Sequence, residues 1–212
     1  MKTNQHFIFD DIINGDYLSI TEDIQSILDT GTSAKSILRD ELIPAMAEVG
    51  RRFEVGEFYL PEMLVAARTM QKGLNILKPM LMKMKLKSSG RIAIGTVSGD
   101  LHDIGKNIVS TMLEGAGFEI IDLGTDVKPG IFIETVSRHN VNLIAMSALL
   151  TTTMTNMDTT IRAVEESGLR EQVKILIGGA PVTREYALKI GADGYAENAS
   201  QAVRVARKLI NQ

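Results

Sequence analysis

A histidine flanked by two carboxylates occupies the centre of residues 98–105, which read Ser-Gly-Asp-Leu-His-Asp-Ile-Gly. A neutral imidazole ligates a metal through one ring nitrogen when the proton on its other nitrogen is held, and a carboxylate is a suitable holder. Asp100 lies two residues before His102 and fits that role. In the plainer alternative, Asp103 caps a helix and His102 is merely exposed. On its own, this short pattern leaves both interpretations open.

The motif lies between a strand pattern and a helix pattern. Residues 91–97 are apolar, β-branched and bounded by glycine, which is typical of a buried strand. Downstream, apolar residues recur at helical spacing until Gly115 and Gly117 end the run. The order strand, turn, helix places the turn at the carboxyl edge of a parallel sheet, where open α/β sheets bind ligands.

Two further motifs follow strand-like runs. Ser147-Ala148-Leu149 comes after the apolar residues 141–146, and Gly178-Gly179 comes after the apolar residues 173–177. All three motifs are therefore expected at the ends of successive parallel strands. There they would line one cleft.

Asp-x-His-x-x-Gly, Ser-x-Leu and Gly-Gly at these intervals resemble the signature of the cobalamin-binding domain shared by methionine synthase, corrinoid mutases and corrinoid methyl-carrier proteins. The resemblance implies that His102 is the metal ligand, replacing the benzimidazole below the cobalt of cobalamin. Asp100 would accept the other N–H of His102, and Thr153 would extend the relay. Serine is common at that position in the family, and threonine keeps the hydroxyl. Asp100, His102 and Thr153 are thus the expected catalytic residues.

The resemblance also implies a slot for the nucleotide tail of the cofactor. Ser147 would donate a hydrogen bond to a benzimidazole nitrogen, Leu149 would make apolar contact, and the motif glycines would remove side chains from the path of the tail. In the alternative, Gly178-Gly179 is only a tight turn. The expected cofactor-binding residues of this domain are Gly99, Asp100, Leu101, His102, Asp103, Ile104, Gly105, Ser147, Leu149, Thr151, Thr153, Gly178, Gly179, Ala196 and Glu197.

The first part of the chain reads as helices throughout. Signals that separate four helices are a break at Asn14-Gly15-Asp16, a stop near Gly31, a cap at Thr32 or Ser33 and a start at Pro61, with Pro44 bending the third. Four helices with short loops predict a small bundle. In the resembled family such a bundle caps the corrin, which implies that Phe53, Leu60 and Met63 shield the methyl group on cobalt. Ordinary bundle core is the alternative for all three.

From Arg91 onward, strands alternate with helices. Strands are expected near 91–97, 118–123, 142–147, 173–178 and 193–196, and helices near 104–116, 129–139, 154–167, 183–190 and 198–211. This pattern predicts an α/β flavodoxin-like (Rossmann-type) doubly wound five-stranded parallel sheet of order 2-1-3-4-5 behind an all-α four-helix bundle cap. The domains are expected at 1–88 and 89–212. Lys83 to Gly90 would form the linker and hinge, or else a frayed helix end.

Composition excludes several classes of function. With 212 residues, 44% hydrophobic and 23% charged, the chain is typical of globular proteins, and a net charge of −3 gives no reason to expect nucleic acid or a membrane surface. The absence of cysteine excludes disulfides, iron–sulfur clusters and cysteine zinc sites. With no signal peptide or membrane span visible, a cytoplasmic location is expected.

The resemblance implies a corrinoid protein that carries a methyl group on cobalt between two methyltransferases. One would act on a methylamine, methanol or glycine betaine donor and leave the cofactor as methylcobalamin. The other would pass the methyl group to coenzyme M or tetrahydrofolate, and a reductive activase is a further partner in such systems. The chain shows no site for the methylated substrate, so complete catalysis by this chain alone is not expected.

Three other interpretations stay open. The cobalamin-binding small subunit of an adenosylcobalamin-dependent mutase would share the sheet domain but would not need the cap. A cobalamin-based light or ligand sensor would share both domains, although such regulators usually add a DNA-binding segment. A flavodoxin-like domain without a corrin would require all three motifs to arise by chance.

Overall fold

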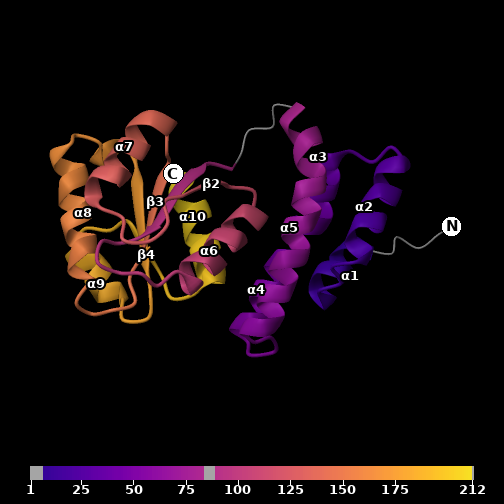
Figure 1. Ribbon diagram of the computed structural model, residues 1–212, viewed down its shortest axis with the longest axis horizontal. Coiled ribbons are helices and arrows are strands. Elements are labelled where there is room, and N and C mark those ends of the chain that lie inside the picture. Colours follow the sequence, from indigo (N-terminus) through magenta and orange to yellow (C-terminus); the bar gives the residue numbers. More distant parts are fainter. Residues whose placement is uncertain (1–6, 84–88, 212) are drawn as a thin grey trace. The chain divides into compact units, whose positions relative to one another are not determined.

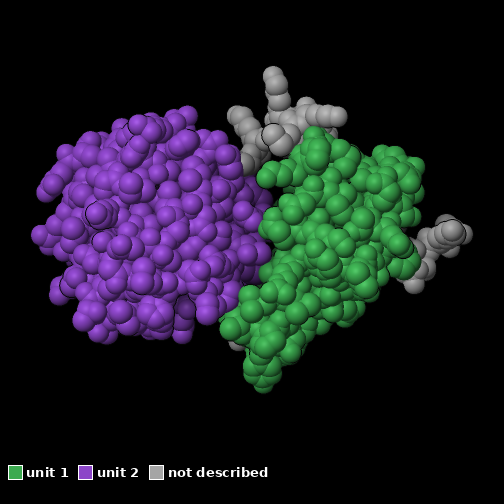
Figure 2. Space-filling model, in the orientation of Figure 1, with its two compact units in different colours: residues 1–87 green, residues 88–212 purple. Residues whose placement is uncertain are grey.

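The protein is described by a computed structural model in which residues 7–83 and 89–211 are placed. The chain divides into two compact units, Met1–Lys87 and Ser88–Gln212, which Figure 2 colours separately. The linker expected at 83–90 falls mainly on residues 84–88, outside the described residues.

The first unit is helical (Figure 1). Its elements are α1 (Phe7–Asn14), α2 (Ser19–Asp29), α3 (Ala34–Ile37), the π-helical segment η1 (Leu38–Leu42), α4 (Ile43–Glu54) and α5 (Leu60–Lys83). Of the two expected caps, the structure uses Ser33, whose side chain accepts a hydrogen bond from the amide of Ser36. Among the placed residues of the chain, no helix is long and apolar enough to cross a membrane.

The segment η1 interrupts the third predicted helix immediately before Pro44. Proline has no amide proton, and its ring crowds the carbonyl group four residues earlier, which belongs to Asp40. The chain responds with a wide turn in which the amide of Ile43 donates to the carbonyl oxygen of Leu38. The structure therefore has a shift of hydrogen-bond register through which α3, η1 and α4 follow one another without a break. The bend expected at Pro44 stays a prediction.

The second unit is α/β, and its sheet order confirms the prediction. Its strands are β1 (Arg91–Thr96), β2 (Glu119–Asp122), β3 (Leu143–Ser147), β4 (Lys174–Gly178) and β5 (Gly194–Ala196), and its α-helices are α6 (Ile104–Gly115), α7 (Pro129–His139), α8 (Thr155–Glu166), α9 (Arg184–Lys189) and α10 (Ala199–Ile210). All strand pairs in this part of the structure are parallel, in the order β2-β1-β3-β4-β5.

Helices cover both faces of this sheet (Figure 1). One face packs against α7, α8 and α9 through residues such as Phe132, Ile161 and Ala187. The other face packs against α6 and α10 through residues such as Leu113 and Ala206. Because the chain leaves β1 and β3 toward opposite faces, the loops that follow these two strands separate. That point is the position where doubly wound sheets bind ligands.

Candidate functional site

The register of the sheet brings the three sequence motifs to one edge. Thr96 at the end of β1 is paired with Ser147 at the end of β3, and Ser147 is paired with Gly178 at the end of β4. The loop that carries His102 follows β1, and the Ser-x-Leu and Gly-Gly motifs lie at the ends of β3 and β4. The common edge predicted from the strand patterns is therefore present.

Asp100 holds one nitrogen of His102 and leaves the other available. The distance from Nδ1 of His102 to Oδ1 of Asp100 is 2.8 Å. Because a carboxylate only accepts hydrogen bonds, this contact places the proton of a neutral imidazole on Nδ1 and its lone pair on Nε2. The His102 side chain is 51% exposed, whereas Asp100 is fully buried. The arrangement presents a fixed imidazole as a metal ligand from a protected anchor.

The buried carboxylate of Asp100 is surrounded by donors. Its Oδ2 accepts from Oγ1 of Thr153 at 2.7 Å and from the amides of Leu149 at 2.8 Å and Leu150 at 3.3 Å. Burial alone would raise the pKa of Asp100, but the bonds from Thr153, Leu149 and His102 hold that pKa well below its usual range. The group stays ionised, and the structure brings together the three residues of the predicted relay.

Asp103 does not act as the helix cap of the plainer alternative. It occupies the position before α6, but its side chain makes no capping hydrogen bond. Instead, Oδ2 of Asp103 accepts from Nδ2 of Asn107 at 3.1 Å. The geometry of this loop thus follows from the Asp100 network and not from a capped helix start.

Thr96 is a site residue that the sequence motifs did not indicate. Its Oγ1 donates to the carbonyl oxygen of His102 at 2.8 Å and lies 2.9 Å from Oγ of Ser147. Since Thr96 has one hydroxyl proton and a carbonyl only accepts, Ser147 is the donor in the second contact. Ser147 can donate to a benzimidazole nitrogen, as predicted, only if its hydroxyl turns away from Thr96. The sequence contained one signal for Thr96, which is a polar residue at the end of an apolar strand.

The glycines of the site have two different surroundings. A Cβ at Gly178 would lie 2.7 Å from the carbonyl oxygen of Ala196, and one at Gly179, where φ is +129°, would overlap the backbone of Ala148. At these two positions the neighbouring protein backbone already excludes a side chain, and the predicted passage of the cofactor tail beside them stays a prediction. A Cβ at Gly105 would meet nothing within 4 Å. Gly105 alone of the three borders open space.

Apolar side chains are exposed around His102. The exposed fractions are 74% for Leu101, 68% for Ile104, 44% for Leu149 and 43% for Leu150. Exposed leucine and isoleucine side chains gathered beside a potential metal ligand indicate a surface that a ligand covers.

The other predicted residues vary in exposure. Thr151 and Glu197 are exposed, and Ala196 is buried. In the helical unit, Phe53 near the end of α4 is half-buried, Leu60 at the start of α5 is 40% exposed and Met63 is 2% exposed. A role for these three in shielding a methyl group stays a prediction.

The donor set fits cobalamin. Within residues 7–83 and 89–211, no group of three or more His, Cys, Asp or Glu side chains could hold a metal ion. A metal bound by His102 must therefore bring most of its other ligands with it, as cobalt does inside a corrin ring. The exposed apolar side chains and the open space at Gly105 suit a large organic group beside that histidine.

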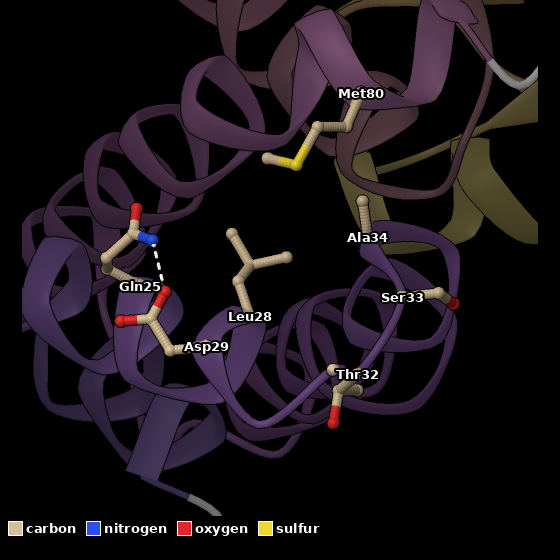
Figure 3. Close-up of a pocket in the computed structure, with 8 residues that line it drawn as sticks. Gln25, Leu28, Asp29, Thr32, Ser33, Ala34 and Met80 are labelled. Atoms are coloured by element: carbon tan, nitrogen blue, oxygen red, sulfur yellow. Dashed lines mark hydrogen bonds between the residues drawn. The ribbon is translucent and has the colours of Figure 1, made fainter.

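A separate cavity of about 580 Å³ lies in the helical unit (Figure 3). Leu28 and Met80 face each other across it, and Gln25 donates to Asp29 at 2.8 Å on its wall. None of the predicted site residues lines it. It is not part of the site around His102.

Comparisons with known proteins agree with this geometry. A family described as a B12 binding domain matches residues 90–204, and a second family with the same description matches residues 6–78. The chain is 51% identical to dimethylamine corrinoid protein 3 of Methanosarcina mazei, over 78% of this chain and 99% of that protein.

Two solved structures are also similar. A cobalamin-binding protein from Desulfitobacterium hafniense has a TM-score of 0.81 and 32% identity, covering 96% of this chain and 97% of that chain. The methanol:cobalamin methyltransferase complex MtaBC from Methanosarcina barkeri contains a chain with a TM-score of 0.86 and 26% identity, covering 99% of this chain and 81% of that chain.

Proposed function

The chain belongs to the family of B12-binding corrinoid proteins, and from that premise we propose that it carries a methyl group between a donor-specific methyltransferase and an acceptor methyltransferase. His102 would hold cobalamin, which would supply a cobalt atom able to accept and release the methyl group. The observation that carries the proposal is the half-exposed imidazole of His102, anchored through Nδ1 to the buried carboxylate of Asp100.

The residues of this chain position and tune that ligand. Asp100 fixes the tautomer of His102 and makes the imidazole a stronger electron donor. Thr153 and the Leu149 amide keep Asp100 ionised by donating hydrogen bonds to it. Leu101, Ile104, Leu149 and Leu150 provide the apolar border. Phe53, Leu60 and Met63 are proposed to shield the methyl group on cobalt, as the family resemblance implies.

The identity of the partners is a further part of the proposal. Similarity to a dimethylamine corrinoid protein supports a methylated amine as the original methyl donor. Similarity to the chain of a methanol:cobalamin methyltransferase complex supports docking of a methyltransferase. The acceptor is proposed to be coenzyme M or tetrahydrofolate, and a reductive activase would restore the cofactor when it becomes oxidised.

The proposal is tested by incubating the purified protein with hydroxocobalamin, desalting it and recording its visible spectrum. The wild type is expected to retain the corrin and to show histidine ligation, which His102→Ala abolishes because the ligand is lost. His139→Ala removes an imidazole from the end of α7 and is the matched control, expected to behave as the wild type. Failure of the wild type to retain any corrin would refute the proposal.

The cofactor preference separates a methyl carrier from a mutase subunit. A carrier is expected to accept a methyl group from methyl iodide after reduction of the bound corrin, which is seen as a change of visible spectrum. Tighter binding of adenosylcobalamin than of methylcobalamin, with no response to methyl iodide, would favour the mutase subunit instead.

A further inference from the structure

Asp126, in the connection between β2 and α7, has a backbone conformation that side chains rarely adopt. Its φ is +53°, and among the described non-glycine residues only Asn140, with φ of +49°, shares this left-handed region. Such conformations are costly for residues with a side chain, and they persist where surrounding contacts require them. The contacts of Asp126 therefore indicate what this backbone conformation serves.

Those contacts all go to the loop that precedes His102. Oδ1 of Asp126 accepts from the amide of Gly99 at 2.6 Å and from Oγ of Ser98 at 3.2 Å. The amide of Asp126 donates to the carbonyl oxygen of Asp100 at 3.0 Å. Three hydrogen bonds thus join one residue to the stretch 98–100.

This stretch forms a tight turn that positions Asp100. The amide of Asp100 donates to the carbonyl oxygen of Val97 at 3.1 Å, and Gly99 has φ of +79°, as the third residue of a type II turn requires. Asn156 on α8 also donates to the carbonyl oxygen of Ser98 at 2.7 Å. The position of the turn fixes Asp100, and Asp100 in turn orients the ring of His102.

Asp122, just before the connection between β2 and α7, contacts the other end of the loop that carries His102, at the start of α6. Asp122, at the end of β2, accepts from Nζ of Lys106 at 2.5 and 2.7 Å, and the Lys106 side chain is only 2% exposed. Lys106 lies in the first turn of α6, four residues after His102. An ammonium group buried to this degree is stable only with its carboxylate partner. Residues 122–126 therefore fix both ends of the loop that carries His102.

We propose that Asp126 is a positioning residue for His102, acting through the turn at residues 97–100, and that the segment 122–126 serves as the brace of the ligand loop. The inference deepens the proposed function, because it concerns how firmly the imidazole is presented to the cofactor. Loss of the Asp126 carboxylate would leave the loop in place but let Asp100 and His102 move.

Two substitutions separate this role from backbone strain. Asp126→Gly removes the carboxylate but suits the positive φ, so it relieves strain while it deletes the brace. Asp126→Asn keeps an acceptor oxygen and tolerates the left-handed region, so it should restore wild-type behaviour. Asn140→Gly is the matched control, because it relieves the same strain at the end of α7, away from the site.

Amide hydrogen exchange in the protein without cofactor gives the first readout. In Asp126→Gly, the amides of Gly99 and His102 are expected to exchange about five- to tenfold faster than in the wild type, as loss of a local hydrogen bond predicts. Asp126→Asn and Asn140→Gly should match the wild type at both amides. Equal exchange in Asp126→Gly and the wild type would overturn the inference.

The second readout is histidine ligation after loading with hydroxocobalamin and reduction to the cobalt(II) state. In protein labelled with nitrogen-15 histidine, electron paramagnetic resonance distinguishes splitting by a histidine nitrogen from splitting by the benzimidazole nitrogen of the cofactor. The histidine-ligated fraction is expected to fall at least about twofold in Asp126→Gly only. An unchanged fraction there would overturn the inference while leaving the proposed function standing. If the wild type retains no corrin, the proposed function fails, and the exchange measurement alone decides whether Asp126 positions the loop.

Discussion

Each unit of the protein buries an aspartate, and the two carboxyl groups have opposite pKa shifts. Asp100 in the α/β unit is 0% exposed, and its pKa lies well below the usual range. Asp11 on α1 of the helical unit is 8% exposed, and its pKa is raised to about 7. Similar burial therefore coexists with an ionised group in one unit and a proton-binding group in the other.

The difference lies in what surrounds each carboxyl. Asp100 accepts hydrogen bonds from the hydroxyl of Thr153 and from the Leu149 amide, while Oδ2 of Asp11 has no partner within the described residues. Burial raises the pKa of Asp11 most, and the hydrogen bond and charge of Asp23 raise it further. Burial disfavours the charge of both carboxylates, and the preorganised donors around Asp100 explain why it alone keeps its charge.

The largest expected effect on stability comes from removing the carboxylate of Asp100. Asp100→Ala removes the acceptor of the Leu149 amide and one of the two acceptors of the Thr153 hydroxyl, the other being the Leu150 carbonyl oxygen at 2.9 Å. A hydrogen bond to a charged group contributes about 1.5–3 kcal/mol. We expect the unfolding free energy of the α/β unit to fall by about 3–5 kcal/mol, measured by urea unfolding at pH 7 with NMR signals of β1 and β3. Asp158→Ala on α8 is the control and should change it by less than about 0.5 kcal/mol.

Asp11→Asn should raise the unfolding free energy of the helical unit, and the size of this gain should depend on pH. With its pKa raised from 3.8 to about 7, Asp11 binds more protons in the folded state across that range. Stability of the helical unit therefore falls as pH rises through the same range. At pH 8 the asparagine variant is expected to exceed the wild type by on the order of 2 kcal/mol, and at pH 4 to match it closely.

The measurement is urea unfolding at both pH values, followed by NMR signals of α1 and α2. Glu22→Gln, at an exposed position of α2, is the control and should leave the pH dependence nearly unchanged. A wild-type helical unit that is equally stable at pH 4 and pH 8 would show that Asp11 is ionised throughout, as Asp100 is.

The smallest expected effect tests one donor of the Asp100 network. Thr153→Val removes a hydroxyl without changing the shape, which should cost about 1 kcal/mol and raise the pKa of Asp100 toward its usual range. Thr153→Ser keeps the donor and should preserve that pKa. Carbon-13 NMR titration of the Asp100 carboxyl distinguishes them, and identical titrations would mean that the Leu149 amide suffices.

Local sequence patterns predicted most of the α/β unit. Strands 91–97 and 142–147 were recognisable because apolar β-branched runs end at polar or glycine motifs, and parallel order then places those motifs at one edge. Thr96 and Asp126 were not predicted as site residues. The contacts of Asp126 depend on which loops meet after folding, and no spacing along the chain encodes that meeting. Thr96 had a local signal, because it is a polar residue at the end of an apolar strand.

The helical unit was predicted less completely, for a related reason. Helix breaks at Gly15 and Gly31 and the cap at Ser33 are local signals, so the sequence contained them. The π turn before Pro44 depends on how the chain accommodates a missing amide, for which bending and a register shift are both solutions. The burial of Asp11 could not be predicted, because an aspartate on a helix is normally exposed.

The π turn also determines how α4 is rotated about its own axis. Successive residues of an α-helix turn by about 100° around its axis, so one residue more or less in the segment Leu38–Leu42 would rotate all of α4 by about that angle. Phe53 and the other side chains of α4 would then point in different directions, although no residue of α4 itself had changed. The length of this five-residue segment, more than its composition, thus determines which face α4 turns toward the rest of the helical unit.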